Sequence, residues 1–334
     1  MQQNSKVTMQ LIADQLGVTK VSVSKALNNQ PGVGAELKQR ILEKARDLGY
    51  AAGAKKPPAE PRRIEFVIGK RYFLEDDKFY TVIYYTINKL CNDRGIRLSL
   101  SIVGNSDEMR LILPPGLATD RPNGLFLAGE LSLPYMRELV QTGIPAVSID
   151  FCHPGLPVDS VVNDNFYAAY CATMHLIGRG HREIGFAGSP EHSASVMDRH
   201  MGYLKAMRSA GLPIRESWHI VNSDRNGNFA VLYDLPDPLP SAYLCNCDKA
   251  AYYLAVKLQS ADIRVPEQVS LVSFDNTDIS KTMSPALTTV DIDKTRMAQM
   301  AFSRLLSRIE SPGEPPVRAV MDAKLLERQS VADR

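Results

Sequence analysis

The chain has 334 residues, of which 44% are hydrophobic and 23% are charged. That length exceeds one typical domain, so we expect at least two domains. The composition excludes a disordered chain, and no apolar run approaches the roughly 18 residues of a membrane-spanning helix. The polar stretch from Met1 to Ser5 contains no apolar signal-peptide core, so we expect a cytoplasmic protein with no membrane partner.

Positive charge gathers at the beginning of the chain. Residues 1–63 contain eleven Lys or Arg and five Asp or Glu, a net charge of +6. Because the whole chain carries +2, the remaining residues carry −4. A basic segment joined to a nearly neutral body is typical of a nucleic-acid contact, although an ordinary solvated helical surface would give the same count.

The five cysteines are an odd and scattered set in a chain without an export signal, which predicts free thiols. Cys245 and Cys247 alternate in an apolar run, so both sulfurs would point to the same face of a strand. A metal pair there is the alternative interpretation, but the six histidines show no spacing of metal ligands. With no Walker, dinucleotide or Gly-x-Ser-x-Gly fingerprint, we expect no metal, no cofactor and no enzyme activity.

The first fifty residues have the apolar spacing of three short helices. Thr8 and Thr19 are placed to cap the first two helices, and Gly17 ends the first. A third helix is predicted from one apolar stripe, formed by Leu37, Ile41, Ala45 and Leu48. The three helices would share one small core.

The joint between the first two helices has the spacing of a helix-turn-helix. Ala13 allows close helix contact, Gly17 follows four residues later in the turn, and Val23 follows six residues after that as a buried anchor. The second helix then has one outward stripe, formed by Lys20, Val21, Ser24 and Lys25. This is the face that a recognition helix places in the major groove.

The side chains of this region suit two kinds of DNA contact. Lys20 and Lys25 can donate to guanine, and Val21 can pack against a thymine methyl group. Hydroxyl and amide side chains suit phosphate oxygens, which position a helix without reading sequence. The predicted DNA-binding residues are Thr8, Thr19, Lys20, Val21, Ser22, Ser24, Lys25, Asn28, Lys55 and Lys56.

The run from Val7 to Asn28 closely resembles the DNA-binding head of the lactose/galactose repressor (LacI/GalR) family. The likeness continues through Val33, Arg40, Ile41 and Leu48–Tyr50. The resemblance implies that the partner is operator double-stranded DNA. Lys25 stands where the family usually has arginine, and lysine does not reproduce a bidentate guanine contact.

Residues 51–63 read as a linker between a helix-turn-helix domain over residues 1–50 and a body over residues 64–334. Gly53 and the consecutive Pro57 and Pro58, without any large apolar residue, favour an extended chain. Members of the family usually have here a hinge helix with a leucine that enters the minor groove. This segment has no leucine, and we expect no hinge helix.

From Ile64 onward, strand-like and helical patterns alternate, which predicts parallel sheets with crossover helices. The buried strands are expected at residues 64–68, 98–103, 124–128, 146–150, 184–187, 242–245 and 269–274. So many strands fit two doubly wound lobes with a ligand cleft at the strand ends. We therefore expect an all-α three-helix head and an α/β two-lobed effector domain.

The body resembles the same family, which is periplasmic-binding-protein-like in this part. The likeness rests on residues 162–165, 269–276, 287–290 and 325–330. It implies a first lobe of about residues 64–162 and 293–319, and a second of about residues 163–292 and 320–334. A helix is shortened near residues 111–116, as in a family repressor of a β-galactosidase operon, which suggests a galactoside effector.

The resemblance also implies effector-binding residues. Arg199 and Asp275 occupy family ligand positions, and a guanidinium fork with a carboxylate suits vicinal hydroxyl groups. Phe229, Phe79 and Tyr80 would offer aromatic faces to a sugar, although each aromatic side chain alone is as readily explained by core packing.

The sequence therefore predicts a homodimeric transcription repressor controlled by a small sugar-type effector. Control by a protein co-repressor and action as an activator stay open, and a sugar-metabolising enzyme is a remote alternative because no paired carboxylates or nucleophile can be placed. An exported sugar carrier is rejected, since it would have no use for a helix-turn-helix.

Overall fold

The computed structural model describes residues 8–27, 30–48, 50, 62–73, 78–224, 228–231 and 233–334. The chain divides into two compact units, Met1–Pro61 and Arg62–Arg334, which are taken separately below. Most of the predicted linker, with Lys55 and Lys56, lies outside the described residues, as does Asn28. The expectation that no hinge helix forms therefore stays a prediction.

The first unit contains the three expected helices, α1 (Met9–Leu16), α2 (Lys20–Leu27) and α3 (Ala35–Asp47). The hydroxyl oxygens of Thr8 and Thr19 accept hydrogen bonds from the backbone N–H groups of Leu11 and Ser22, at 3.3 and 3.1 Å, which confirms both caps. Gly17 has φ of 64° and ends α1. The buried core consists of Ile12, Ala13, Val23, Ala26, Ile41 and Ala45.

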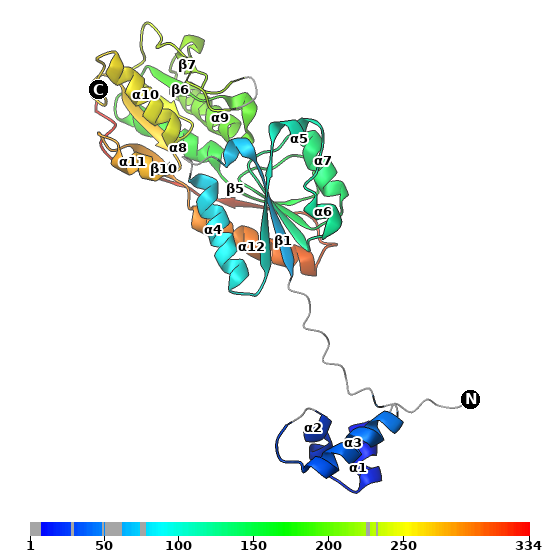
Figure 1. Cartoon of the computed structure of the whole chain (residues 1–334). Coiled ribbons are helices and arrows are strands. Elements are labelled where there is room, and N and C mark those ends of the chain that lie inside the picture. The colour runs from blue at the N-terminus through cyan, green and yellow to red at the C-terminus, as the bar shows by residue number, and fades with distance from the viewer. Residues whose placement is uncertain are drawn as a thin grey trace. The chain divides into compact units, whose positions relative to one another are not determined.

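The second unit has two lobes, each built on a six-stranded sheet (Figure 1). The first sheet has the order β11-β5-β4-β3-β1-β2 and is parallel throughout. Its strands are β1 (Arg63–Gly69), β2 (Arg97–Val103), β3 (Gly124–Ala128), β4 (Ala146–Ile149), β5 (Asp159–Asn163) and β11 (Arg318–Met321).

The second sheet has the order β12-β10-β9-β8-β6-β7, and only the pairing of β10 with β12 is antiparallel. Its strands are β6 (Ile184–Ala187), β7 (His219–Ile220), β8 (Ala242–Cys245), β9 (Ser270–Phe274), β10 (Thr288–Asp291) and β12 (Lys324–Leu326). Short crossovers with helices join the parallel strands, as the alternating sequence pattern predicts.

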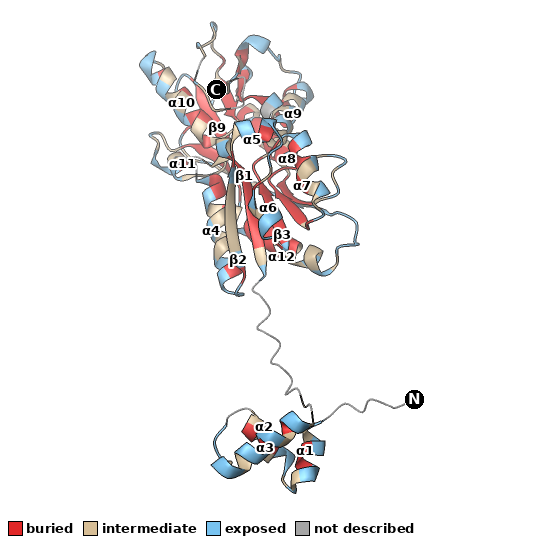
Figure 2. Ribbon diagram, turned by 45° about the vertical axis from the view of Figure 1, so that its right-hand side comes forward, coloured by how far each residue is buried: buried red, intermediate tan, exposed pale blue. Residues whose placement is uncertain are grey.

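Helices cover both faces of each sheet, so the strands are buried between them (Figure 2). In the first lobe, α4 (Phe79–Asn92) and α12 (Lys294–Glu310) pack on one face, and α6 (Gly116–Thr119) and α7 (Leu133–Gln141) pack on the other. The short α5 (Asn105–Met109) follows β2. Continuous apolar strands are typical of parallel sheets covered in this way.

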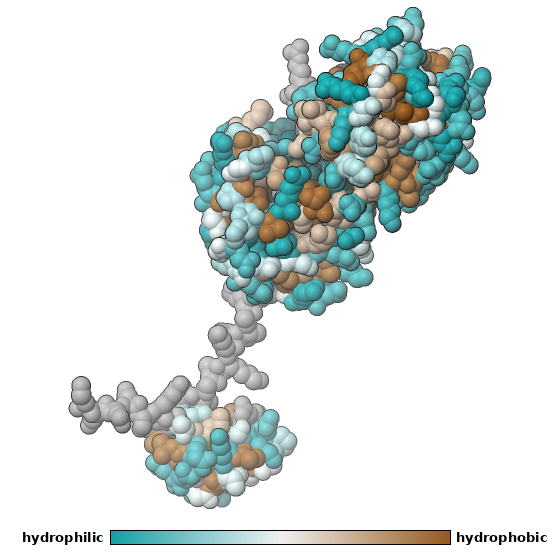
Figure 3. Space-filling model, turned by 180° about the vertical axis from the view of Figure 1, so that it is seen from behind, coloured by the Kyte–Doolittle hydropathy of each residue, from teal (hydrophilic) through white to brown (hydrophobic). Residues whose placement is uncertain are grey.

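In the second lobe, α8 (Asn165–Gly178) and α9 (Ala194–Ser209) share one face, and α10 (Asp248–Ser260) covers the other. The short α11 (Asp278–Thr282) follows β9. A single apolar cluster runs from α4 and α12 through to α8 and α9, so the core continues between the lobes. On the surface of the body, hydrophobic side chains stand in separate groups among hydrophilic ones (Figure 3).

The chain passes between the lobes three times. The first passage is at Asp164, the second lies between β10 and α12, and the third lies between β11 and β12. Within the first lobe, the buried Asp159 at the start of β5 accepts two hydrogen bonds of 2.9 Å from Arg308, which fastens the C-terminal part of α12 to the sheet. The lobes are therefore joined by three neighbouring segments of chain.

The structure agrees with the predicted strands to within a residue or two and adds others. Arg63, assigned above to the linker, is the first residue of β1. Five strands in the described part of the chain were not predicted: β5, β7, β10, β11 and β12.

The strand orientation expected for Cys247 is wrong, because β8 ends at Cys245. The sulfur of Cys247 instead accepts a hydrogen bond from the N–H of Ala250, as the cap of α10. No described helix has both the length and the apolar content to cross a bilayer.

Candidate functional site

The expected recognition surface lies on α2. Lys20 is exposed, and Val21 has 62% of its surface accessible although it is apolar. The anchors Val23 and Ala26 are buried on the opposite side of the same helix. The exposed side of α2 thus combines an apolar side chain with a positive charge.

Three cavities lie between the two lobes of the body. They measure about 360, 300 and 180 Å³, and each has lining residues from both lobes. Arg71 lines the first two, and Lys249 lines the last two, so the three cavities form a row. They open where the strands of both sheets end, which is where doubly wound folds bind ligands.

Arg199 is a buried charge next to this cleft. Its side chain projects from α9, only 4% of the residue is exposed, and its guanidinium lies 4.4 Å from the ring centre of Phe274. Its Nε donates to Oδ1 of Asn165 at 2.8 Å, and its Nη1 donates to the carbonyl oxygen of Asn246. Its third guanidinium nitrogen, Nη2, lies 3.4 Å from Oδ1 of Asp275. The two residues expected from sequence to share a ligand thus lie together.

Asp275 follows β9 in a strained backbone. Its φ is 99°, and that of Asn276 is 47°, both in the left-handed region that favours glycine. Such conformations cost of the order of 1–3 kcal/mol and persist only where surrounding contacts fix them. Here Lys294 donates to the carbonyl oxygen of Asp275, and Arg328 donates to the side chain of Asn276 at 2.6 Å. These contacts hold the loop in its left-handed geometry at the edge of the 180 Å³ cavity, which Asp275 lines.

The three aromatic side chains expected at the site occupy different surroundings. Phe229 lines the 300 Å³ cavity, with the amine of Lys249 5.1 Å from its ring centre. Phe79 is buried in the core at the start of α4, with Lys294 5.7 Å from its ring centre. Tyr80 is also buried, and its hydroxyl donates to Asp150 at 3.4 Å. Of these three side chains, Phe229 alone is among the residues that line the cavities described here.

Asp150 is a buried carboxyl group at the end of β4. Besides Tyr80, the amide of Asn163 donates to it at 3.4 Å. Burial raises the pKa of Asp150 to about 6, and the charge of Arg199 offsets part of that rise. The carboxyl therefore changes protonation near the pH range of the cell, inside the hinge between the lobes.

Two further contacts join the lobes at the rim of the cleft. Glu130 of the first lobe accepts a hydrogen bond of 2.5 Å from the N–H of Ala194, at the positive N-terminus of α9. Lys78 forms an exposed ion pair of 3.0 Å with Asp278 of the second lobe. Exposed ion pairs contribute little to stability, so the Lys78–Asp278 pair can open at small cost.

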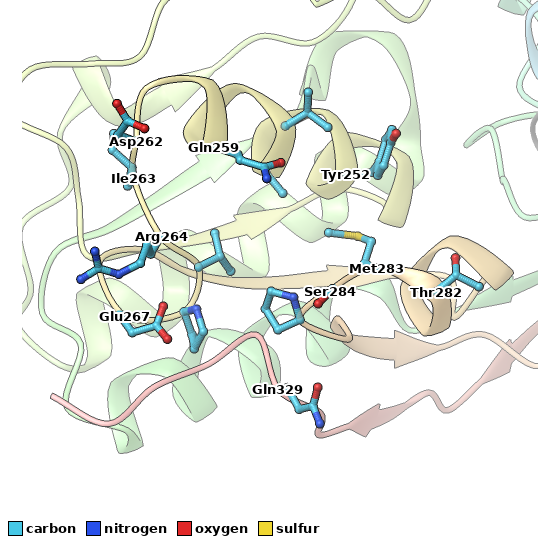
Figure 4. A pocket seen from close by; sticks show the side chains of 15 residues that line it. Tyr252, Gln259, Asp262, Ile263, Arg264, Glu267, Thr282, Met283, Ser284 and Gln329 are labelled. Atoms are coloured by element: carbon cyan, nitrogen blue, oxygen red, sulfur yellow. The ribbon is translucent and has the colours of Figure 1, made fainter.

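A separate groove of about 980 Å³ lies on the outer side of the second lobe (Figure 4). Tyr252 and Gln259 project into it from α10, and Met283 enters from the end of α11. Tyr252 and Val256 are 42% and 45% exposed. An open groove edged by exposed apolar side chains is typical of a protein contact surface.

Several site residues were not found from sequence, namely Asp150, Asn165, Asn246, Asp248, Lys249 and Lys294. Asp150 and Asn246 end or follow predicted strands, which is a signal that could have identified them. The other four residues stand at the starts of the helices α8, α10 and α12, where the chain returns to the cleft. Only the three-dimensional structure shows that they lie near the site.

The pKa of Asp150 predicts a pH-dependent stability. As the pH rises from the usual carboxyl pKa of 3.8 to about 6, the unfolded chain loses its proton before the folded chain does, so the folded state loses stability. Asp150→Asn stays neutral and tolerates the positive φ of 69°. We expect this variant to be more stable than the wild type at pH 7.5, by up to about 3 kcal/mol, and equally stable near pH 4.

The measurement is urea unfolding of the body at both pH values. Asp262→Asn is the matched control, because Asp262 also has positive φ but is exposed. A gain of stability that is the same at both pH values would contradict the prediction.

Comparisons with known proteins support a single family. Residues 173–331 match the periplasmic-binding-protein-like domain. The HTH-type transcriptional repressor PurR of Photorhabdus laumondii is 27% identical over 98% of this chain and 97% of its own length. PurR of Shigella sonnei is 29% identical with the same coverage.

Solved structures share the fold. The transcriptional regulator CelR in complex with cellobiose has a TM-score of 0.70 at 23% identity, covering 97% of this chain and 99% of its own. A lac repressor dimer bound to operator and an anti-inducer has a TM-score of 0.70 at 18% identity, covering 98% and 100%. The relatives span both the helical head and the two-lobed body, so the chain is similar over nearly its whole length to HTH-type transcriptional repressors and shares its fold with solved transcription regulators.

Proposed function

We propose that this regulator is a repressor whose operator affinity is controlled by a small sugar-type effector bound between the lobes. The observation that carries the proposal is the carboxylate of Asp275, which lines the 180 Å³ cavity and lies 3.4 Å from the buried guanidinium of Arg199. A fork of donors next to a strong acceptor matches two adjacent hydroxyl groups. Phe229 would pack on the C–H face of the ring.

The ligands of known structures support a sugar as the class of effector. CelR is in complex with cellobiose, a LacI-family regulator from Enterococcus faecium holds ribose, and one from Alkaliphilus metalliredigens holds D-xylulofuranose. Galactosides belong to the same chemical class and are included because of the shortened segment at residues 111–116. Phe79 and Tyr80 would act from behind the site, Tyr80 through its hydrogen bond to Asp150.

For operator DNA, we propose that Lys20, Val21 and Lys25 face the bases, while Thr8, Thr19, Ser22, Ser24, Asn28, Lys55 and Lys56 contact phosphates. A head of this kind reads one half-site, and two heads in a symmetric dimer read a palindrome. The groove between α10 and α11 would receive the same surface of a second copy, since an isologous contact needs one self-complementary patch.

Effector control is tested by operator binding in the presence of D-galactose, lactose, cellobiose and D-ribose. We expect at least one sugar to change operator affinity tenfold or more. Asp275→Asn should bind operator as the wild type does but lose the response, because removal of a buried charged partner costs about 1.5–3 kcal/mol of ligand affinity. Asp93→Asn serves as the control, because Asp93 is exposed and lines none of the cavities or the groove described above. A normal response of Asp275→Asn would remove that residue from the site.

The recognition surface is tested by Lys20→Ala. If Lys20 reads a base, its loss should relax the sequence preference at one position in each half-site and cost about 1–3 kcal/mol. The comparison is Lys44→Ala, which removes a charge from the last turn of α3 and should weaken all sequences alike. Binding to randomised operators measures both; equal losses on operator and on random DNA for Lys20→Ala would show that this lysine is not a base reader.

The groove is tested by Val256→Asp. A charge placed in a buried apolar contact should shift the protein from dimer to monomer, with an increase in the dimer dissociation constant of at least a hundredfold. Val221→Asp is the matched control, because Val221 is 46% exposed next to the edge strand β7, away from the groove. Sedimentation equilibrium distinguishes the two variants, and a dimeric Val256→Asp protein would place the contact elsewhere.

A further inference from the structure

Asp248 is a buried carboxylate that the proposed function does not use. It is the first residue of α10, only 1% of it is exposed, and it lines none of the four cavities described above. Four hydrogen bonds converge on its two oxygens. The donors are the hydroxyls of Ser273 (2.5 Å) and Thr289 (2.7 Å), and the N–H and hydroxyl of Thr277 (2.6 and 2.9 Å).

These donors come from three different elements. Ser273 lies in β9, Thr289 lies in β10, and Thr277 caps α11 at the end of the loop that carries Asp275. Thr289 also accepts from the N–H of Asn276 at 3.4 Å. One carboxylate thus joins α10, two strands and the effector loop at the bottom of the 180 Å³ cavity, which Thr277 itself lines.

The loop needs such a fixed partner. Asp275 and Asn276 have consecutive positive φ values, a geometry that unconstrained residues of these types leave readily. Asn276 is held from the opposite side by Asp291 at 2.8 Å, and Asp248 takes the backbone N–H of Thr277 directly. A carboxylate accepts at both oxygens, whereas an amide has an acceptor at one end only, so the side chain at position 248 must be charged to satisfy all four donors.

We propose that Asp248 is the positioning residue of the effector site, which holds the loop so that the carboxylate of Asp275 faces Arg199, without touching the effector. The proposal rests on the function proposed above for Asp275. The proposal assigns two different roles. Asp275 contacts the ligand, and Asp248 holds the loop that positions Asp275. Preorganisation of this kind raises affinity because the loop is ordered before the ligand arrives.

The test compares Asp248→Asn with Ser273→Ala in the full-length protein. Both variants remove hydrogen bonds at the same carboxylate, but Ser273 lies in a strand whose ladder stays intact, so Ser273→Ala reports the purely structural cost. Thr277→Val is the second test variant if Asp248→Asn fails to fold, since it deletes one loop donor and keeps the shape of the side chain.

The first measurement is hydrogen–deuterium exchange of residues 275–282 without any sugar. We expect Asp248→Asn to raise the exchange rate of this segment at least tenfold and Thr277→Val at least threefold, while Ser273→Ala stays within twofold of the wild type. Unchanged exchange in both test variants, or an equal rise in Ser273→Ala, would overturn the positioning role.

The second measurement is binding of the same four sugars by calorimetry, together with operator affinity in the absence of sugar. We expect Asp248→Asn to weaken sugar binding at least tenfold and to leave operator affinity within threefold of the wild type. Sugar binding at the wild-type strength would overturn the proposal. If the wild type itself binds none of the sugars, the proposed effector class fails, and the exchange experiment still decides the role of Asp248.

Discussion

The buried charge of Arg199 is the constraint on which the body of this protein depends. A guanidinium out of water must be neutralised and its donors satisfied, and removing a partner from such a pair costs about 3–5 kcal/mol. Asn165, Asn246 and Asp275 supply these partners from three separate segments, and Phe274 supplies a ring face. The helix starts and strand ends of the second lobe are therefore gathered around a single side chain.

This arrangement also accounts for the electrostatics of the hinge. Asp150, in the first lobe, is buried within reach of the charge of Arg199, and its pKa is still raised because burial outweighs that charge. Its partners Tyr80 and Asn163 come from α4 and β5. Asp150 of the first lobe, whose charge depends on its protonation, thus lies within electrostatic reach of the permanently charged Arg199 of the second lobe. The electrostatic attraction between the lobes therefore changes with the protonation of Asp150.

Much of the fold could be predicted from the sequence, for identifiable reasons. Strands such as β1, β3 and β9 are continuous apolar runs because helices bury both of their faces. The caps at Thr8 and Thr19 were predictable because they depend on neighbouring residues only. Strands β11 and β12 were missed because they are short and partly exposed, and each pairs with a strand that is not its neighbour in the sequence, β11 with β5 and β12 with β10.

The site could be predicted only in part. Arg199 and Asp275 were recognised by resemblance, and the structure brings them to 3.4 Å. The residues that hold them, Asn165, Asp248 and Lys294, carry no local signal, since a polar residue at a helix start has the same appearance whether it caps the helix or organises a distant loop. For Phe79 and Tyr80, the resemblance predicted aromatic rings that face a ligand, whereas the described structure places both side chains in the core.

The place where the linker meets the body has a mechanical consequence. Residue 62 leads into the amino end of β1, while the cavities lie beyond its carboxyl end, where Arg71 follows the strand. The seven residues of β1 span about 23 Å. A structural change in the cleft must therefore be transmitted across the whole first lobe before it reaches the linker. If two chains pair as proposed above, a change in the cleft would alter the separation between the starts of their β1 strands, and with it the spacing of half-sites that the two heads can reach.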